Sequence, residues 1–403
     1  MLMRRTGDSK LIQELNRFII LDMIRKHGPI SRSEIAKRNG ISPTTVTSAV
    51  GELIRDGLVC EDGIGESSGG RKPIMLRFYP DGQFLIGISL TNTAVTIAEL
   101  NLEANVRHKE RFAYDKPLAG DDVIAYLFAS LEQFLSRYDD RSKCLGISII
   151  VPGIVDAANG AIRYNSKLNL KNVPLKELVE AKFGLKTWLE NDANAIALAE
   201  NSFGRGTHSD NMLYVTVGEG VGMGIIVNGA IFRGHNGGAG EFGHTVVQQT
   251  GTRCDCGNIG CLENNVGWPE IYSRILSAHA KGKQTVIIEL AGGDVTRISP
   301  ALFRAALQQN DQVCLDIMEE IAATLSIGIV NLVNLFNPSL IILGGEIVRD
   351  NPLFVKRVRE QVMDKALFIL TDGLEIHATA LGEEFPMVAA AAVLLQDVFH
   401  FSL

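Results

Sequence analysis

The sequence predicts an α/β protein with a small helical domain at the N-terminus and a larger body of two α/β lobes. Three observations predict this arrangement: helical periodicity over the first 55 residues, a strand–meander–helix scheme that occurs twice after residue 80, and glycine-rich turns between buried strands. We expect domains at residues 1–79, 80–190 and 191–403, with the last helix returning to the first lobe.

The bulk composition is that of a soluble globular protein, because 46% of the 403 residues are hydrophobic and 21% are charged. The start of the chain lacks the apolar run of a signal peptide, and the apolar stretch 387–395 is too short to span a bilayer. With only six cysteines, we expect a reduced, cytoplasmic protein without a membrane partner.

Charge is unevenly distributed along the chain. Residues 1–78 carry 13 Lys and Arg against 9 Asp and Glu, a net charge of +4, whereas the remainder carries −11 of the total of −7. A basic N-terminal segment on an acidic body fits a nucleic-acid contact confined to the N-terminus, although an excess of four charges also occurs by chance.

The N-terminal domain reads as three helices. Apolar residues recur at helical spacing from about Ser9 to His27, and Gly28-Pro29 ends that helix. Ser31 and Glu34 form a capping box for a short second helix. Ser42 caps a third, which has Pro43 at its first position and shows hydroxyl side chains on its leading face.

This order of helices is typical of a helix-turn-helix, and two strands with a Gly/Ser-rich tip, 58–61 and 74–78, would add a wing. A small packing module and, for the tip, a solvated linker are the alternatives. The domain resembles the winged helix-turn-helix of bacterial sugar-operon repressors. The expected DNA contacts are Ser42, Thr44, Thr45, Thr47 and Ser48 on the third helix, and Arg71 and Lys72 in the tip.

A histidine and three cysteines cluster in the second half of the body. His244, Cys254, Cys256 and Cys261 fall within twenty residues, separated by glycines that let the backbone turn around an ion. Thiolates with imidazole suit a closed, four-coordinate Zn²⁺ site, at a spacing tighter than that of a zinc finger. Unliganded buried cysteines or a disulfide are the alternatives; isolated Cys60, Cys144 and Cys314 fit the first of these.

The body resembles the ROK family, whose name stands for repressors, open reading frames and kinases. The resemblance covers residues from about 80 to the C-terminus. It is carried by Pro152-Gly153, Glu190-Asn191-Asp192-Ala193-Asn194, Gly218-x-Gly220-x-Gly222-x-Gly224, Gly240-Glu241-Phe-Gly-His244, Cys254-x-Cys256-Gly-x-x-Gly-Cys261-Leu-Glu263 and Leu343-Gly-Gly-Glu346.

The resemblance implies an actin-like fold of two lobes, related to ribonuclease H and to sugar kinases, with a sugar in the cleft. By motif position, the sugar ligands would be Asn191, Asp192, Glu241, His244 and Glu263. Fixed carboxylates and amides suit a polyol, and His244 would bind zinc through one ring nitrogen while the other faces the sugar. Asn191 and Asp192 also fit a helix N-cap, and the two roles are compatible.

Both phosphate loops of the family's kinases are altered here. The first loop of the kinases reads Asp-x-Gly-Gly-Thr, whereas this chain has Ser89, Leu90, Thr91, Asn92 and Thr93. In the second loop Glu219 replaces a threonine, with no Lys or Arg evident nearby, and its carboxylate would repel a triphosphate. We therefore expect no catalytic residue and no kinase activity, with Asp192 left to bind sugar only.

The resulting prediction is a sugar-responsive repressor of a carbohydrate operon that binds a palindromic operator as a homodimer or tetramer. The alternatives are an active sugar kinase with an appended DNA-binding domain, and a repressor controlled by a phosphotransferase component. Retention of all five sugar-side residues disfavours the last. The identity of the effector stays open among xylose, glucose, a glucoside and an amino sugar, because Asn264-Asn265 and Trp268 depart from the family's pattern. Whether the sugar acts as inducer or as co-repressor is also open.

Overall fold

The computed structural model describes residues 9–66, 72–207 and 209–399. The chain forms two compact units: unit 1 contains residues 1–150, 174–189 and 390–403, and unit 2 contains residues 151–173 and 190–389. This division differs from the expected domains, since residues 151–173 group with unit 2 and the N-terminal domain groups with the strands that follow it. The limits 1–79, 80–190 and 191–403 therefore stay predictions.

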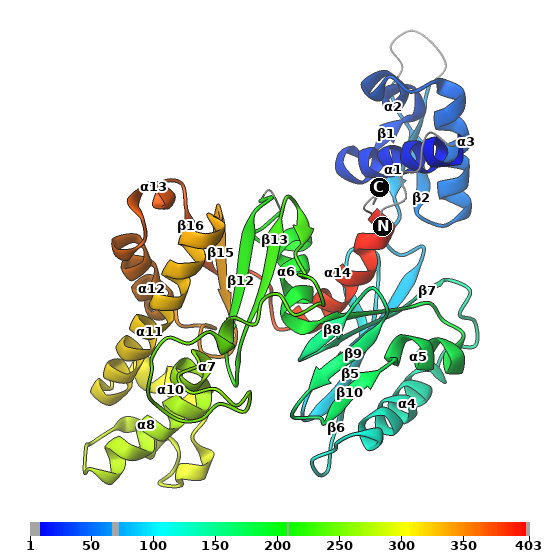
Figure 1. The fold of residues 1–403 in the computed structure, drawn as a ribbon. Helices are drawn as coiled ribbons and strands as arrows, with labels where there is room; N and C mark the ends of the chain where they lie inside the picture. The colour runs from blue at the N-terminus through cyan, green and yellow to red at the C-terminus, as the bar shows by residue number, and fades with distance from the viewer. Residues whose placement is uncertain (1–8, 67–71, 208, 400–403) are drawn as a thin grey trace. The chain divides into compact units, whose positions relative to one another are not determined.

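The N-terminal domain, which we call the head, contains the three expected helices and two wing strands (Figure 1). They are α1 (Ser9–His27), α2 (Arg32–Asn39), α3 (Pro43–Arg55), β2 (Val59–Ile64) and β3 (Ile74–Phe78). The Ser31 hydroxyl accepts from the Glu34 amide and the Ser42 hydroxyl from the Thr45 amide, as the capping signals predict. A short strand that the sequence did not reveal, β1 (Ile30–Ser31), pairs with β3 and makes the sheet three-stranded.

The remainder of unit 1 is built on a five-stranded sheet of order β11-β7-β4-β5-β6. Its elements are β4 (Phe84–Leu90), β5 (Ala94–Leu100), β6 (Val106–Ala113), α4 (Asp121–Leu135), β7 (Cys144–Val151), α5 (Leu175–Phe183) and β11 (Thr187–Asn191). Every residue of β4 is buried, and β4 pairs antiparallel with β5 and parallel with β7. The last helix, α14 (Phe385–Phe399), crosses from unit 2 into unit 1 at residue 390.

Unit 2 contains a second five-stranded sheet, of order β14-β13-β12-β15-β16. Its strands are β12 (Met212–Val217), β13 (Val221–Val227), β14 (Ala230–Ile231), β15 (Leu340–Gly344) and β16 (Glu375–Ala378). In Figure 1, α6 (Asp192–Phe203) covers one face of this sheet, and α11 (Gln312–Phe336) and α12 (Pro352–Lys365) lie on the other.

The smaller elements of unit 2 surround this sheet. They are β8 (Ile154–Asp156), β9 (Ala161–Asn165), β10 (Leu170–Val173), η1 (Phe242–His244), α7 (Glu263–Val266), α8 (Trp268–Ala280), α9 (Val286–Leu290), η2 (Val295–Arg297), α10 (Pro300–Gln308) and α13 (Phe368–Thr371). The antiparallel sheet β10-β9-β8 lies in a stretch for which the sequence analysis predicted no strands. Among the residues that the structure describes, no helix is both long and apolar enough to cross a membrane.

The two large sheets follow one plan. Each starts with a hairpin, β4–β5 or β12–β13, extends on one side by a further antiparallel strand, and pairs on the other side with a parallel strand. The repeated scheme expected from the sequence is therefore confirmed.

Candidate metal centre and ligand-binding site

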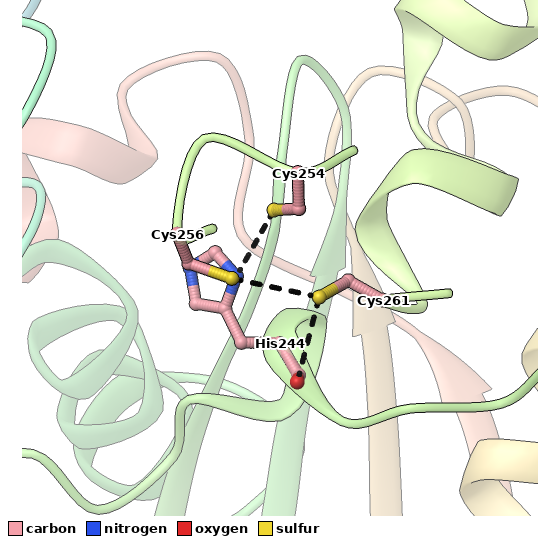
Figure 2. Close-up of side chains that lie close together, drawn as sticks. All are labelled: His244, Cys254, Cys256 and Cys261. Atoms are coloured by element: carbon pink, nitrogen blue, oxygen red, sulfur yellow. Dashed lines mark hydrogen bonds between the residues drawn. The ribbon is translucent and has the colours of Figure 1, made fainter. Parts of the chain in front are cut away.

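The four predicted metal ligands converge in unit 2. The ligand atoms of His244, Cys254, Cys256 and Cys261 all lie within 4.8 Å of one another (Figure 2). The Cys254 sulfur lies 3.6 Å from His244 Nδ1, and the sulfurs of Cys256 and Cys261 are 3.6 Å apart. All three thiols are free in this structure, which favours the metal-site interpretation over a disulfide.

Backbone pairing holds the loop that carries the cysteines. The Val247 amide donates to Gly260 and the Leu262 amide to Thr245, which brings Cys261 beside the segment that follows His244. Gly260 has a φ of +82°, and a Cβ at this position would lie 1.7 Å from the Gln248 carbonyl oxygen. Only glycine permits this approach, so the glycines noted in the sequence shape the loop.

The geometry of the four side chains fits a tetrahedral ion. Zn–S bonds of about 2.3 Å and Zn–N bonds of about 2.0 Å place the ligand atoms of a tetrahedral site about 3.5–3.8 Å apart. The two separations of 3.6 Å agree with that spacing, and all four ligand atoms lie within 4.8 Å of one another. Three sulfurs and one imidazole nitrogen are also a donor set that zinc prefers.

The thiols have unequal acidities in the absence of an ion. Burial raises the pKa of Cys261 to about 12, whereas the backbone amide of Asn258 helps to lower the pKa of the exposed Cys256 thiol. A bound divalent cation would deprotonate all three thiols, so metal uptake would release protons.

His244 connects the cluster to the carboxylates. Its Nδ1 faces Cys254, and its Nε2 lies 3.8 Å from the Glu241 carboxylate. Partial burial raises the pKa of Glu241, the charges of Glu263 and Asp192 raise it further, and His244 lowers it. The charges of Asp192 and Glu263 therefore both act on the Glu241 carboxyl.

Asn191 and Asp192 stand at the start of α6. The Asn191 side chain accepts from the Asn194 amide at 3.0 Å and donates to the Gly153 carbonyl at 2.9 Å, so it does act as the N-cap. Asp192 is half-buried and accepts from the Ala193 amide at 2.9 Å. Burial raises the pKa of the Asp192 carboxyl.

Glu263 is tied to the β12–β13 turn. Its Oε2 accepts from the Val221 amide at 2.9 Å, and a Cβ on Gly220 would lie 2.6 Å from that oxygen. Glycine at position 220 therefore makes room for the carboxylate, and one carboxylate oxygen is committed to the turn. The other oxygen keeps its capacity to accept from a ligand hydroxyl.

Glu190 and Arg233 form an ion pair that was not predicted from the sequence. Glu190 is 1% exposed and receives Arg233 Nε and Nη2 at 2.8 and 2.6 Å. It also accepts from the Asn191 amide at 2.9 Å and from the Asn194 side chain at 3.1 Å. The pair thus supports the first turn of α6. Glu190 belongs to a motif, but Arg233 lies 43 residues away without a sequence signal.

The expectation that Glu219 has no Lys or Arg nearby is wrong. Its neighbouring cation is Lys167, whose Nζ lies 3.5 Å from the Glu219 carboxylate. Lys167 belongs to the β9–β10 turn, 52 positions earlier, so the pairing could not be read from local sequence. Both side chains are well exposed, which makes the pair a weak one.

In unit 1 the backbone of the β4–β5 turn is hydrogen-bonded by the side chain of Thr91, which lies in the turn itself. The Thr91 hydroxyl accepts from the amides of Thr93 and Ala94, at 3.4 and 3.1 Å, and donates to the Ala94 carbonyl. Backbone amides that a glycine turn would present to a phosphate are therefore already engaged. Ser89 is buried in β4, and Asn92 stands in the turn.

The expected DNA-contacting residues of the head lie at and near the start of α3. Ser42 and Thr45 bond each other in the N-cap, and the Thr47 hydroxyl donates to the Pro43 carbonyl. Thr44 and Ser48 are exposed, as is Lys72. Arg71 lies outside the described residues.

Two family models match the chain. The ROK family model matches residues 85–397, and a model described as winged helix-turn-helix DNA-binding matches residues 14–59.

Named relatives align over almost the whole chain. A xylose repressor of Caldicellulosiruptor bescii is 33% identical over 98% of this chain and 99% of its own. The DNA-binding transcriptional dual regulator NagC of Escherichia coli is 31% identical over 98% of both chains.

Solved structures show the same likeness. A ROK family transcriptional regulator, described as a homologue of the E. coli MLC protein, has a TM-score of 0.85 at 27% identity and covers 96% of this chain and 98% of its own. A ROK family glucokinase from Streptomyces griseus, solved with glucose and AMPPNP, has a TM-score of 0.66 at 27% identity, over 76% of this chain and 98% of its own.

Proposed function

Because this chain belongs to the ROK family and carries a winged helix-turn-helix in front of the family domain, we propose that it is a sugar-responsive transcriptional repressor. The observation that carries the proposal is the contact between Glu241 and the cluster residue His244, with the charges of Asp192 and Glu263 acting on the same Glu241 carboxyl, in a chain that also contains a winged helix-turn-helix. Full-length relatives named as repressors support the same conclusion.

We propose that the sugar is held by Asn191, Asp192, Glu241, His244 and Glu263. The carboxylates of Asp192, Glu241 and Glu263 are strong acceptors for hydroxyl groups. Their negative charges act on one another at Glu241, so a neutral sugar fits them better than an anionic one. Since relatives include xylose repressors, xylose is the first effector to test, followed by glucose, a glucoside and N-acetylglucosamine.

The proposed cofactor is a structural zinc ion bound by His244, Cys254, Cys256 and Cys261. A bound ion would supply no chemistry to the ligand; it would hold the loop that ends at Glu263 and keep the His244 ring oriented. Metal content and sugar affinity should therefore change together.

We further propose that the protein has no kinase activity. Phosphoryl transfer requires positioned amides and cations around the phosphates. In this chain Thr91 engages the amides of one turn, Ser89 stands where the kinases have a magnesium-binding carboxylate, and Glu219 adds a negative charge to the other turn. Its pairing with Lys167 reduces that charge without creating a phosphate site.

In the proposed mechanism two copies place two heads on a palindromic operator, and sugar binding changes operator affinity. The coupling must be reciprocal, so operator DNA should change sugar affinity by the same factor. We assign the protein to the cytoplasm, where both operator and sugar are available.

The first experiment is a thermal-shift screen of the full chain with the sugar panel, because a ligand that binds the folded state raises the melting temperature. A hit should lose its effect in Asp192→Ala and should alter binding to operator fragments selected from genomic DNA. A chain that binds its operator but responds to no sugar would contradict the proposal and favour control by a protein partner, such as a phosphotransferase component.

An ATP-coupled turnover assay with the same sugar panel tests the alternative that the protein is a sugar kinase. We expect no phosphorylation above background. Turnover that disappears in Asp192→Ala would show that the body is an active sugar kinase.

A further inference from the structure

Two turns of unit 2 that lie far apart in the sequence are joined by one ion pair. Lys167 belongs to the β9–β10 turn, and its Nζ lies 3.5 Å from the carboxylate of Glu219 in the β12–β13 turn. Each turn is also bonded to a residue of the proposed sugar site. The pair therefore has a position from which it can act on a bound ligand.

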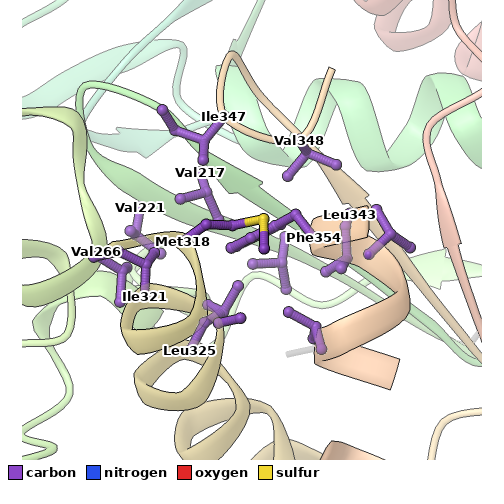
Figure 3. Packing of buried hydrophobic residues seen from close by; sticks show 14 of the residues in the cluster. Val217, Val221, Val266, Met318, Ile321, Leu325, Leu343, Ile347, Val348 and Phe354 are labelled. Atoms are coloured by element: carbon purple, nitrogen blue, oxygen red, sulfur yellow. The ribbon is translucent and has the colours of Figure 1, made fainter. Parts of the chain in front are cut away.

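The β12–β13 turn has a fixed base. Val217 and Val221, at its two ends, are buried in the hydrophobic core of unit 2 (Figure 3). The carbonyl just before Glu219 accepts from the Trp268 amide at 2.8 Å, and the Val221 amide donates to the Glu263 carboxylate at 2.9 Å. The backbone of the turn is thus held against the segment that carries Glu263, while the Glu219 side chain is 70% exposed.

The β9–β10 turn is fixed in a similar way. Asn165 is 5% exposed, accepts from an amide of the turn at 2.7 Å and donates to the Pro152 carbonyl at 2.8 Å. The carbonyl of the following residue, Gly153, accepts from the Asn191 side chain at 2.9 Å. Two consecutive carbonyls thus connect the turn to Asn191, while the Lys167 side chain is 49% exposed.

The ion pair therefore links two segments that each hold a proposed sugar ligand. Hydrogen bonds lead from the Glu219 turn to Glu263 and from the Lys167 turn to Asn191. An exposed pair stabilises its closed form only about two- to fivefold over the open form. A contact this weak can open to admit a ligand and form again afterwards, because the backbone of both turns keeps its own bonds.

We propose that Lys167 and Glu219 are positioning residues that form a latch across the proposed sugar site and slow the release of the bound sugar. The inference rests on the proposed function, since it requires that Asn191 and Glu263 bind sugar. It goes beyond that function by giving a role to two residues outside the proposed metal and sugar ligands. It also makes the residence time of a neutral ligand depend on a charge pair.

The test is charge reversal in the full chain. Lys167→Glu places two carboxylates opposite each other and should open the latch, whereas Lys167→Glu combined with Glu219→Lys restores a pair of opposite charges. Stopped-flow tryptophan fluorescence measures the rates, since the Trp268 amide is bonded to the β12–β13 turn. Xylose is the first ligand, followed by glucose, a glucoside and N-acetylglucosamine.

The release rate should rise about two- to fivefold in the single variant and return to the wild-type value in the double variant. The association rate should change much less, because the turns that hold the sugar ligands keep their own bonds. High salt should speed release from the wild type towards the rate of the single variant, because salt screens exposed charges.

A second measurement needs no sugar. Hydrogen exchange of the amides in turns 166–169 and 218–220 should be faster in Lys167→Glu and slow again in the double variant. Lys182→Glu is the matched control, because Lys182 forms an exposed pair with Glu132 at 3.2 Å in unit 1. It should leave both the exchange of these turns and the release rate unchanged.

A defect of the single variant that the double variant does not repair would overturn the proposal, because Lys167 would then act without Glu219. Sugar that binds normally and leaves at one rate in all variants would contradict the latch alone. Exchange that follows the charge pair in a chain that binds no sugar of the panel would instead contradict the proposed function, and with it any effect of the latch on a ligand.

Discussion

The two five-stranded sheets share one plan, but the turns of their first hairpins have different surroundings. In unit 1 the β4–β5 turn is satisfied by its own Thr91 hydroxyl and carries none of the proposed ligand-binding residues. In unit 2 the β12–β13 turn is held by Glu263 through the Val221 amide and thereby contacts the proposed sugar site. One hairpin turn is bonded only to itself, whereas the other is tied to a residue of the proposed sugar site.

This difference supports the proposal that the chain binds a sugar without phosphorylating it. Phosphate binding depends on unengaged amides at both turns, whereas sugar binding depends on side chains of unit 2. Under the proposed function, the altered turns provide no phosphate site and leave the carboxylates of unit 2 in place. The predictions below test whether the two units differ in this way, starting with the largest expected effect.

Cys261→Ser should have the largest effect. Cys261 is fully buried in the metal cluster, so the variant should lose most of the bound zinc, and the loop that leads to Glu263 should lose its order. Sugar binding should fall below detection. Metal content by mass spectrometry and sugar affinity by calorimetry are the measurements. Cys144→Ser in unit 1 is the control, and sugar affinity that survives without metal would contradict the link.

Arg233→Ala should come next. The variant leaves the buried Glu190 carboxylate without its cation, which should cost about 2–4 kcal/mol of stability. Chemical denaturation measures the loss, and Arg233→Lys should recover part of it. Lys182→Ala, which removes an exposed ion pair with Glu132 in unit 1, should change stability much less. Equal losses in the two variants would show that the buried pair has no special role.

Asp192→Ala should lower sugar affinity by about 1.5–3 kcal/mol, the range for a hydrogen bond to a charged group. Its counterpart is Asn92→Ala in the β4–β5 turn, which should leave sugar affinity unchanged. Calorimetric titration with the effector compares them. If Asn92→Ala weakened sugar binding as much as Asp192→Ala, the division of roles between the hairpins would be wrong.

Sugar binding should weaken as the pH falls from neutrality. Burial raises the pKa of Asp192, and the ionised carboxylate is the better hydroxyl acceptor, so protonation should begin above the range near 4 where an ordinary Asp titrates. The effect on folding stability has the opposite sign. Because the Asp192 pKa is higher in the folded state than in the unfolded state, the ionised carboxylate destabilises the folded protein above that pKa, and this destabilisation disappears as the pH falls. Affinity titrations of wild type and Asp192→Asn test this, and only the wild type should show that phase.

Glu219→Thr should have the smallest effect. The exposed pair with Lys167 contributes at most about 0.5–1 kcal/mol, so stability should barely change. The variant should also gain no kinase activity, because the Thr91 hydroxyl still occupies the backbone amides of the β4–β5 turn. Phosphorylation of a sugar by this single variant would show that the unit 2 turn alone prevents catalysis.

Local signals allowed much of the fold to be predicted. The helix caps at Ser31 and Ser42 depend on residues three positions apart, and the metal cluster is contained within 18 positions. The pairs Glu190–Arg233 and Lys167–Glu219 could not be predicted, because they join residues that only the folded sheet brings together. The sheet β8–β10 was missed because its strands have three to five residues, too few for a clear alternation.

The order of the chain segments in the two units limits which parts of this protein can be exchanged by recombination. The head occupies one uninterrupted segment, whereas units 1 and 2 exchange the chain at residues 150, 173, 189 and 389. A single genetic crossover near residue 80 would transfer the whole head, but Arg25 and Phe78 of the head contact Phe399 of α14, so the receiving chain must supply a matching last helix. Neither lobe of the body can be exchanged by one crossover, because each unit contains segments that are separated along the chain.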